Sequence, residues 1–142
     1  MADTRQDPRT TPMKIEIEGF SHIIALYRAL IEAKFNDNPT DADVPDSALV
    51  ADLANQVADA LEQHERTNPV ASGSEEGEWR NPSNHPRRIE FVRRRLTECS
   101  LWSDWTTDEK QHYIRILLSP LRAEPSFCQE LLEFGDKTHQ TP

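Results

Sequence analysis

A polar stretch of 22 residues, His64 to His85, separates two groups of apolar residues that recur at helical spacing. It contains Asn68-Pro, Ser72-Gly-Ser-Glu-Glu-Gly and Asn81-Pro, combinations that interrupt regular structure. Connections of this length are uncommon inside a compact domain, so we expect residues 66–83 to form a hinge or linker. The chain is therefore predicted to form one domain, residues 14–142, made of two helical parts, 14–65 and 84–135. Residues 1–13 are polar and are expected to be a disordered tail.

The first part reads as an acidic helical hairpin. Apolar residues at helical spacing predict one helix from Ser21, its expected N-cap, to about Lys34, and a second from about Asp46 to Gln63. Residues 36–45 between them are rich in Asn, Asp and Pro, which favour a turn. Residues 14–18 alternate with period two, but no partner strand is visible elsewhere in the sequence, so we expect coil there.

The second part reads as a three-helix unit. Pro86 opens a helix that should run to about Cys99. Thr106 and Glu109 form a capping-box pattern that opens the next helix, which should end at about Ser119 and be the most buried one. A fifth helix should run from Pro125 to Gly135. The predicted fold class is therefore all-α, with about five helices.

The charge is unevenly distributed along the chain. The net charge is −9, and residues 1–70 hold 6 basic and 13 acidic side chains, whereas residues 84–95 hold five arginines and one glutamate. An acidic protein has little general affinity for nucleic acid or anionic membranes, but a local basic face can still bind either. The arginine-rich segment is therefore the first place to look for a binding site.

On a helix, the arginines of this segment surround one aromatic residue, Phe91. Ile89, Val92, Leu96 and Cys99 form the apolar stripe, so Phe91 is expected to lie off the core face. The flanking side chains three or four positions away are Arg87, Arg88, Arg94 and Arg95. Arginine stacks on aromatic rings and pairs with carboxylates, so these five residues are the candidate partner-binding set.

Several interpretations of this set stay open. We favour a non-enzymatic protein–protein interaction module, acting as an adaptor, an inhibitor or a small subunit of an intracellular assembly, with a second copy of the chain as one possible partner. RNA or DNA could instead contact the arginines, with Phe91 stacked on an unpaired base. The arginines could also pair internally with carboxylates of the first two helices while Phe91 joins the core. Finally, the acidic hairpin could imitate phosphate charge in an inhibitor of a nucleic-acid-binding protein.

One short motif suggests an enzyme. Arg80-Asn-Pro-Ser-Asn-His85 places a histidine five positions after an arginine. It resembles the catalytic signature of HEPN ribonucleases, an all-helical family. The resemblance covers six residues and implies that Arg80 and His85 act on a scissile phosphate without metal. The alternative is a polar loop leading into the helix that begins at Pro86.

The remaining reactive residues predict no cofactor and no metal site. Cys99 and Cys128 lack metal-ligand spacing and are expected to be free thiols. Glu109 and His112 have the Glu-x-x-His spacing of di-iron bundles, but no second copy accompanies them. With neither a signal-like apolar segment nor an 18-residue apolar run, the sequence predicts a cytoplasmic protein that does not span a membrane.

Overall fold

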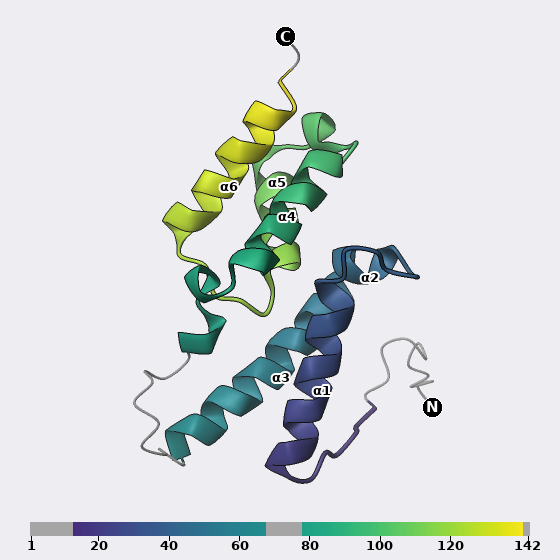
Figure 1. Ribbon diagram of the computed structural model, residues 1–142, viewed down its shortest axis with the longest axis vertical. Coiled ribbons are helices and arrows are strands. Elements are labelled where there is room, and N and C mark those ends of the chain that lie inside the picture. Colours follow the sequence, from purple (N-terminus) through teal and green to yellow (C-terminus); the bar gives the residue numbers. More distant parts are fainter. Residues whose placement is uncertain (1–12, 68–77, 141–142) are drawn as a thin grey trace, which may run out of the picture.

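The computed structural model describes residues 13–67 and 78–140, and this part of the chain contains α-helices and short 3₁₀ turns but no strand (Figure 1). The elements in chain order are α1 (Phe20–Lys34), α2 (Asp43–Asp46), α3 (Ala48–Thr67), η1 (Glu78–Arg80), η2 (Pro82–Asn84), α4 (Pro86–Glu98), η3 (Trp102–Asp104), α5 (Thr107–Leu118) and α6 (Pro125–Thr138). The all-α prediction is confirmed, and the sixth helix, α2, is a four-residue turn inside the segment expected to be a loop.

Helices α1 and α3 lie side by side and form the N-terminal part (Figure 1). Ala51, Ala54 and Ala58 recur along α3 and are buried, so small side chains let the two helices approach closely. The expected N-cap at Ser21 is wrong: α1 begins one residue earlier, and Gly19 precedes it with a φ of 95°, in the region that favours glycine. Residues 14–18 have no assigned secondary structure, as expected.

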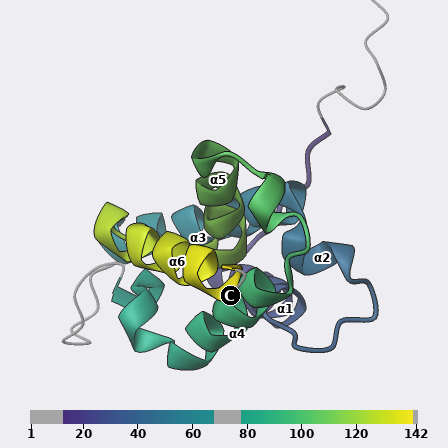
Figure 2. The same cartoon turned by 90° about the horizontal axis from the view of Figure 1, so that it is seen from above.

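Helices α4, α5 and α6 form the C-terminal part around one apolar core (Figure 2). Its buried residues are Ile89, Phe91, Val92, Leu96, Trp102, Ile114, Leu117, Leu118, Leu121, Leu131 and Leu132. The predicted capping box is present: the Thr106 hydroxyl accepts from the Glu109 N–H at 3.2 Å, and the Glu109 carboxylate accepts from the Thr106 N–H at 3.3 Å. The order of helices predicted for this half is confirmed.

Gly135 does not end α6, contrary to the prediction. The helix continues to Thr138, and a Cβ atom at Gly135 would clash with the ring of Trp102. The Trp102 indole N–H donates to the Asp136 carboxylate at 2.9 Å, which fixes the ring against the helix. Gly135 therefore serves the packing of a buried tryptophan and not helix termination.

The expected linker is partly ordered. Helix α3 extends to Thr67, and residues 78–84 form two 3₁₀ turns in which Arg80 and Pro82 are buried. Trp79 packs edge-on against the Tyr27 ring of α1, with ring centroids 5.3 Å apart. Residues 66–67 of the expected linker thus belong to α3 and most of residues 78–83 form 3₁₀ turns, while residues 68–77 and the predicted tail up to residue 12 lie outside the described residues.

Lys34, the last residue of α1, makes a buried contact between the two parts. Its side chain is 1% exposed, and its ammonium donates to the backbone carbonyl of Ile116 in α5 at 2.7 Å. Burial lowers the pKa of Lys34 to about 8, and the negative charge of Asp46 opposes that fall. This hydrogen bond places a buried polar contact at the junction between the parts, whereas the core of the C-terminal part is apolar.

Candidate functional site

Phe91 is a core residue, so the prediction that it lies off the core face is wrong. Its side chain is 3% exposed, and its ring meets the ring of Phe35 edge-on with centroids 5.6 Å apart. The reason is that α4 is covered on two sides: its apolar stripe faces α5 and α6, and the end of α1 covers the side that carries Phe91. A pattern read from one helix cannot reveal a second neighbour on its polar side.

The four arginines around Phe91 separate into different environments. Arg94 pairs with Asp37 in the α1–α2 loop, and Arg95 pairs with Asp46 of α2 at 2.6 Å. Arg88 lies over the ring of Phe35, with 5.5 Å between its guanidinium carbon and the ring centroid, and Arg87 is exposed. Two of the four arginines therefore bind carboxylates near the acidic hairpin, which is the internal pairing considered as an alternative.

Arg80 lies in a buried ion-pair cluster between the two parts of the molecule. It is 3% exposed; its guanidinium donates to Glu62 at 2.5 Å, to Asp59 at 2.8 Å and to Asn55 at 3.3 Å, and its Nε donates to the Pro120 carbonyl at 2.8 Å. Every nitrogen of the guanidinium therefore already has a protein acceptor.

Two neighbours complete the surroundings of Arg80. Arg122 also donates to Glu62, at 2.7 Å; burial would raise the pKa of Glu62, but the hydrogen bonds from Arg80 and Arg122 outweigh it and lower that pKa. His85 Nε2 lies 2.6 Å from the Trp79 carbonyl oxygen. Arg80 thus has no guanidinium nitrogen left to contact a phosphate, whereas one ring nitrogen of the half-buried His85 is engaged.

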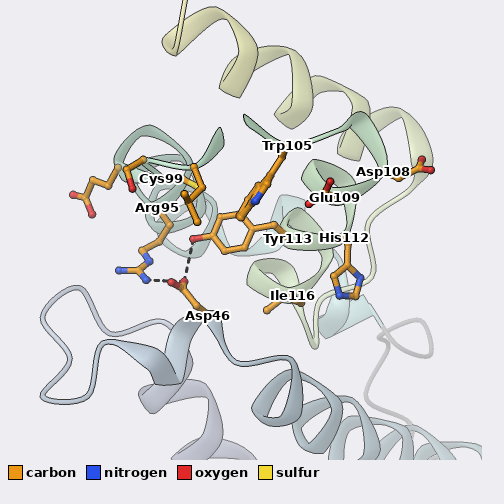
Figure 3. A pocket seen from close by; sticks show the side chains of 12 residues that line it. Asp46, Arg95, Cys99, Trp105, Asp108, Glu109, His112, Tyr113 and Ile116 are labelled. Atoms are coloured by element: carbon orange, nitrogen blue, oxygen red, sulfur yellow. Dashed lines mark hydrogen bonds and ion pairs between the residues drawn. The ribbon is translucent and has the colours of Figure 1, made fainter. Parts of the chain in front are cut away.

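A recess with apolar walls and polar groups at its edge lies between α4 and α5, and we call it the α4–α5 groove. It has a volume of about 740 Å³. It is lined by Asp46, Arg95, Glu98, Cys99, Ser100, Leu101, Trp105, Asp108, Glu109, His112, Tyr113 and Ile116 (Figure 3). The apolar members come from the end of α4, the segment around η3 and one face of α5, so three successive elements build its wall.

Two aromatic rings form the middle of the groove. Trp105 and Tyr113 meet edge-on with centroids 5.2 Å apart, and both are half-buried (Figure 3). Leu101 is 54% exposed, an unusual position for a large apolar side chain that borders a recess. Trp102, three positions before Trp105, is buried in the core, so the two tryptophans lie in different environments and no local pattern distinguishes them.

The inner end of the groove is polar and fixed. The Asp46 carboxylate accepts from the Tyr113 hydroxyl at 3.0 Å and from Arg95 at 2.6 Å (Figure 3). Burial, with the negative charge of Asp46, raises the pKa of Tyr113 well above its ordinary value, so the phenol stays protonated. The Arg95 Nε is buried without a hydrogen-bond partner among the described residues.

The rim of the groove is acidic. Glu98, Asp108 and Glu109 are exposed, and of these Glu109 is engaged by the capping box of α5. Arg95 is occupied by Asp46, which leaves Glu98 and Asp108 as the charges that an incoming group would meet. An apolar wall with two exposed carboxylates at its edge can accept an apolar side chain that has a positive charge beside it.

Comparisons of the chain with protein-family models, with curated proteins and with solved structures give no match. Within residues 13–67 and 78–140, no helix is both long and apolar enough to cross a membrane. In the same residues, no three His, Cys, Asp or Glu side chains gather in a way that could hold a metal ion.

Proposed function

We propose that the protein is a protein-interaction module that binds a short segment of its partner in the α4–α5 groove. The segment would place an apolar side chain against Leu101 and Trp105 and a Lys or Arg beside Glu98 or Asp108. The observation that carries this proposal is the exposed Leu101 at a groove of about 740 Å³ with an acidic rim. An adaptor, an inhibitor and a small subunit of an assembly all need one selective surface of this kind.

This proposal moves the contact surface away from Phe91. Binding hot spots are aromatic or apolar side chains in recesses whose edges exclude water, and Trp105 meets that description better than a ring inside the core. Nucleic acid is a less supported partner, because Phe91 cannot stack on a base while buried and Arg94 and Arg95 already hold carboxylates. The acidic rim would also repel phosphates.

Selection from a library of random peptides tests the proposal and requires no candidate partner. We expect enriched peptides to share an apolar residue next to Lys or Arg. Leu101→Asp should weaken their binding by about 30-fold or more, as expected for loss of an apolar anchor. The matched control is Leu49→Asp, because Leu49 is 79% exposed on α3 and does not line the groove. Enrichment of acidic peptides, or equal binding to both variants, contradicts the proposal.

A charge reversal tests the rim independently. Replacing Glu98 and Asp108 together with Lys should abolish binding of the selected basic peptides and permit binding of the same peptides with Lys or Arg changed to Glu. Glu133→Lys, on the exposed face of α6, adds positive charge elsewhere and should change neither. If Leu101→Asp instead dissociates a dimer of the wild-type chain, the groove is occupied by a second copy.

A further inference from the structure

The segment of residues 13–18, which precedes α1, carries apolar side chains that the rest of the described chain leaves uncovered. Met13 is 87% exposed and Ile15 is 88% exposed, and neither belongs to a helix. Apolar and charged residues alternate along this segment, so in an extended conformation Met13 and Ile15 lie on one side and Lys14 on the other. Lys14 is exposed as well. The segment thus offers two apolar side chains with a positive charge between them.

This combination is rare among the exposed apolar side chains of the molecule. The large apolar side chains that are exposed in the described part of the chain are Met13, Ile15, Ile17, Phe20, Leu49, Leu53 and Leu101. Only Met13 and Ile15 have a Lys or Arg next to them in the sequence, and Leu101 is the anchor of the α4–α5 groove itself. An apolar side chain beside a positive charge is what this groove should accept, because its wall is apolar and its rim is acidic.

The segment cannot reach the groove of its own copy. The near end of the groove lies beside the last residue of α1, because Ile116 lines the groove and its carbonyl accepts from Lys34. Residues 13–18 leave the other end of α1, a helix of 15 residues and thus about 22 Å long. The chain between Ile15 and Phe20 spans at most about 18 Å. Residues 13–18 and η3 lie toward opposite ends of the molecule (Figure 1). A segment of this kind in the groove therefore has to come from a second copy.

The charges decide which part of the segment fits. Glu98 and Asp108 at the rim are exposed carboxylates, and the long side chain of Lys14 can pair with either one. The residues that follow Ile15 in the segment include two glutamates, which the acidic rim repels, so the contact ends at Ile15. Two copies with a net charge of −9 repel each other in general. Association therefore needs a local contact between opposite charges, and Lys14 supplies one.

We propose that the α4–α5 groove of one copy of the protein binds residues 13–15 of a second copy. Met13 and Ile15 pack against Leu101 and Trp105, and Lys14 pairs with a carboxylate of the rim. This inference rests on the proposed function, because it names a partner segment for the same groove. Each copy carries both the segment and the groove, so two copies can exchange segments and close the assembly with two identical contacts.

A labelled peptide of residues 12–18, blocked at both ends, tests recognition of the segment. The Ile15→Asp protein keeps its groove but loses its own apolar anchor, so it should bind the peptide in fluorescence anisotropy without competition. Adding Leu101→Asp to that protein should weaken binding by about 30-fold or more. A peptide in which Met13 and Ile15 are both replaced by Ser should not bind. Equal binding of the two peptides, or no effect of Leu101→Asp, contradicts the inference.

Mixing two variants tests the contact between full-length chains. In analytical ultracentrifugation, the mass of the wild type should rise between about 10 μM and about 1 mM, whereas Ile15→Asp and Leu101→Asp should each stay monomeric alone. Their equimolar mixture should associate when its concentration exceeds the dissociation constant measured for the peptide, because one variant supplies the groove and the other the segment. A mixture that stays monomeric under this condition would overturn the inference.

Two further experiments locate the contact. Leu49→Asp changes an exposed leucine of α3 outside the groove and should leave self-association unchanged. If it dissociates the assembly instead, the second copy covers α3 and the inference fails. Lys14→Glu should weaken self-association. Mixing it with the variant in which Glu98 and Asp108 are both Lys should restore the contact, since the charges are exchanged. No recovery in this mixture would show that Lys14 does not meet the rim.

The outcomes separate this inference from the proposed function. If peptides selected from a library depend on Leu101 for binding but the peptide of residues 12–18 does not bind, the groove has a different partner. The inference then fails while the proposed function stands. If neither kind of peptide binds in a way that depends on Leu101, both fail.

Discussion

The N-terminal and C-terminal parts of the molecule differ in the packing that stabilises each of them. The C-terminal part has eleven buried residues in one cluster, among them Phe91, Trp102 and several leucines. The pair α1 and α3 packs largely through alanines and buries few large side chains of its own. The stabilising free energy grows with the apolar area that is buried. We therefore expect the C-terminal part to be stable by itself and the N-terminal pair to depend on its contacts with that part.

Those contacts are both apolar and polar. The Phe35 ring meets Phe91, whereas Lys34 and Arg95 bond to groups across the junction. The α4–α5 groove takes Asp46 from α2 and its other lining residues from the C-terminal part, so it lies at this junction. Peptide binding in the groove should therefore be coupled to how firmly α2 is held against the C-terminal part.

The largest expected effect tests the apolar core. Phe91→Ala should lower the free energy of unfolding by about 4 kcal/mol, because it removes a buried ring and leaves a cavity. Chemical denaturation measures this change. Phe20→Ala is the matched control in the N-terminal part, because Phe20 is exposed and should cost far less. A decrease of less than about 1 kcal/mol in the free energy of unfolding on Phe91→Ala would favour the interpretation of this ring as an exposed binding residue.

The second prediction concerns the polar junction. Arg80→Ala should lower the free energy of unfolding by about 3 kcal/mol, because it leaves the buried Glu62 with only the more exposed Arg122 and Arg66 as cationic partners. Hydrogen exchange should accelerate more in α1 and α3 than in α5 and α6.

Arg122 offers a control with the same partners, Glu62 and Asp59. Its side chain is 59% exposed, so Arg122→Ala should lower the free energy of unfolding by less than about 1 kcal/mol. If exchange in α5 and α6 accelerates equally when Arg80 is removed, the two parts unfold as one unit and the contrast between them fails.

The third prediction uses pH to probe Lys34. Its pKa is about 8 when folded and 10.5 ordinarily, so between these values the unfolded chain binds more protons and the stability due to Lys34 rises with pH. From about pH 7 to about pH 9.5, the free energy of unfolding of the wild type should gain about 2 kcal/mol relative to Lys34→Met. Lys14→Met, at an exposed lysine, is the control. If the wild type instead loses free energy of unfolding relative to Lys34→Met as the pH rises, the fold stabilises the charged form of Lys34.

The sequence predicted what depends on local patterns. The capping box at Thr106 and the start of α4 at Pro86 were correct, because each is determined by neighbours within a few residues. The burial of Phe91 and the role of Gly135 were missed, because each depends on a ring from elsewhere in the chain, Phe35 or Trp102. The α4–α5 groove was missed for the same reason: a groove between elements has no local pattern.

The smallest expected effect on stability is at Leu101. Because this side chain is more than half exposed, Leu101→Asp should change the free energy of unfolding by no more than about 0.5 kcal/mol. The same change should nevertheless remove peptide binding in the α4–α5 groove, while Phe91→Ala should affect binding only as far as it unfolds the protein. Calorimetry on the folded variants measures both quantities in one preparation. A Leu101→Asp protein that unfolds readily would make Leu101 part of the packing between α4 and α5, and the groove would then lose its principal anchor.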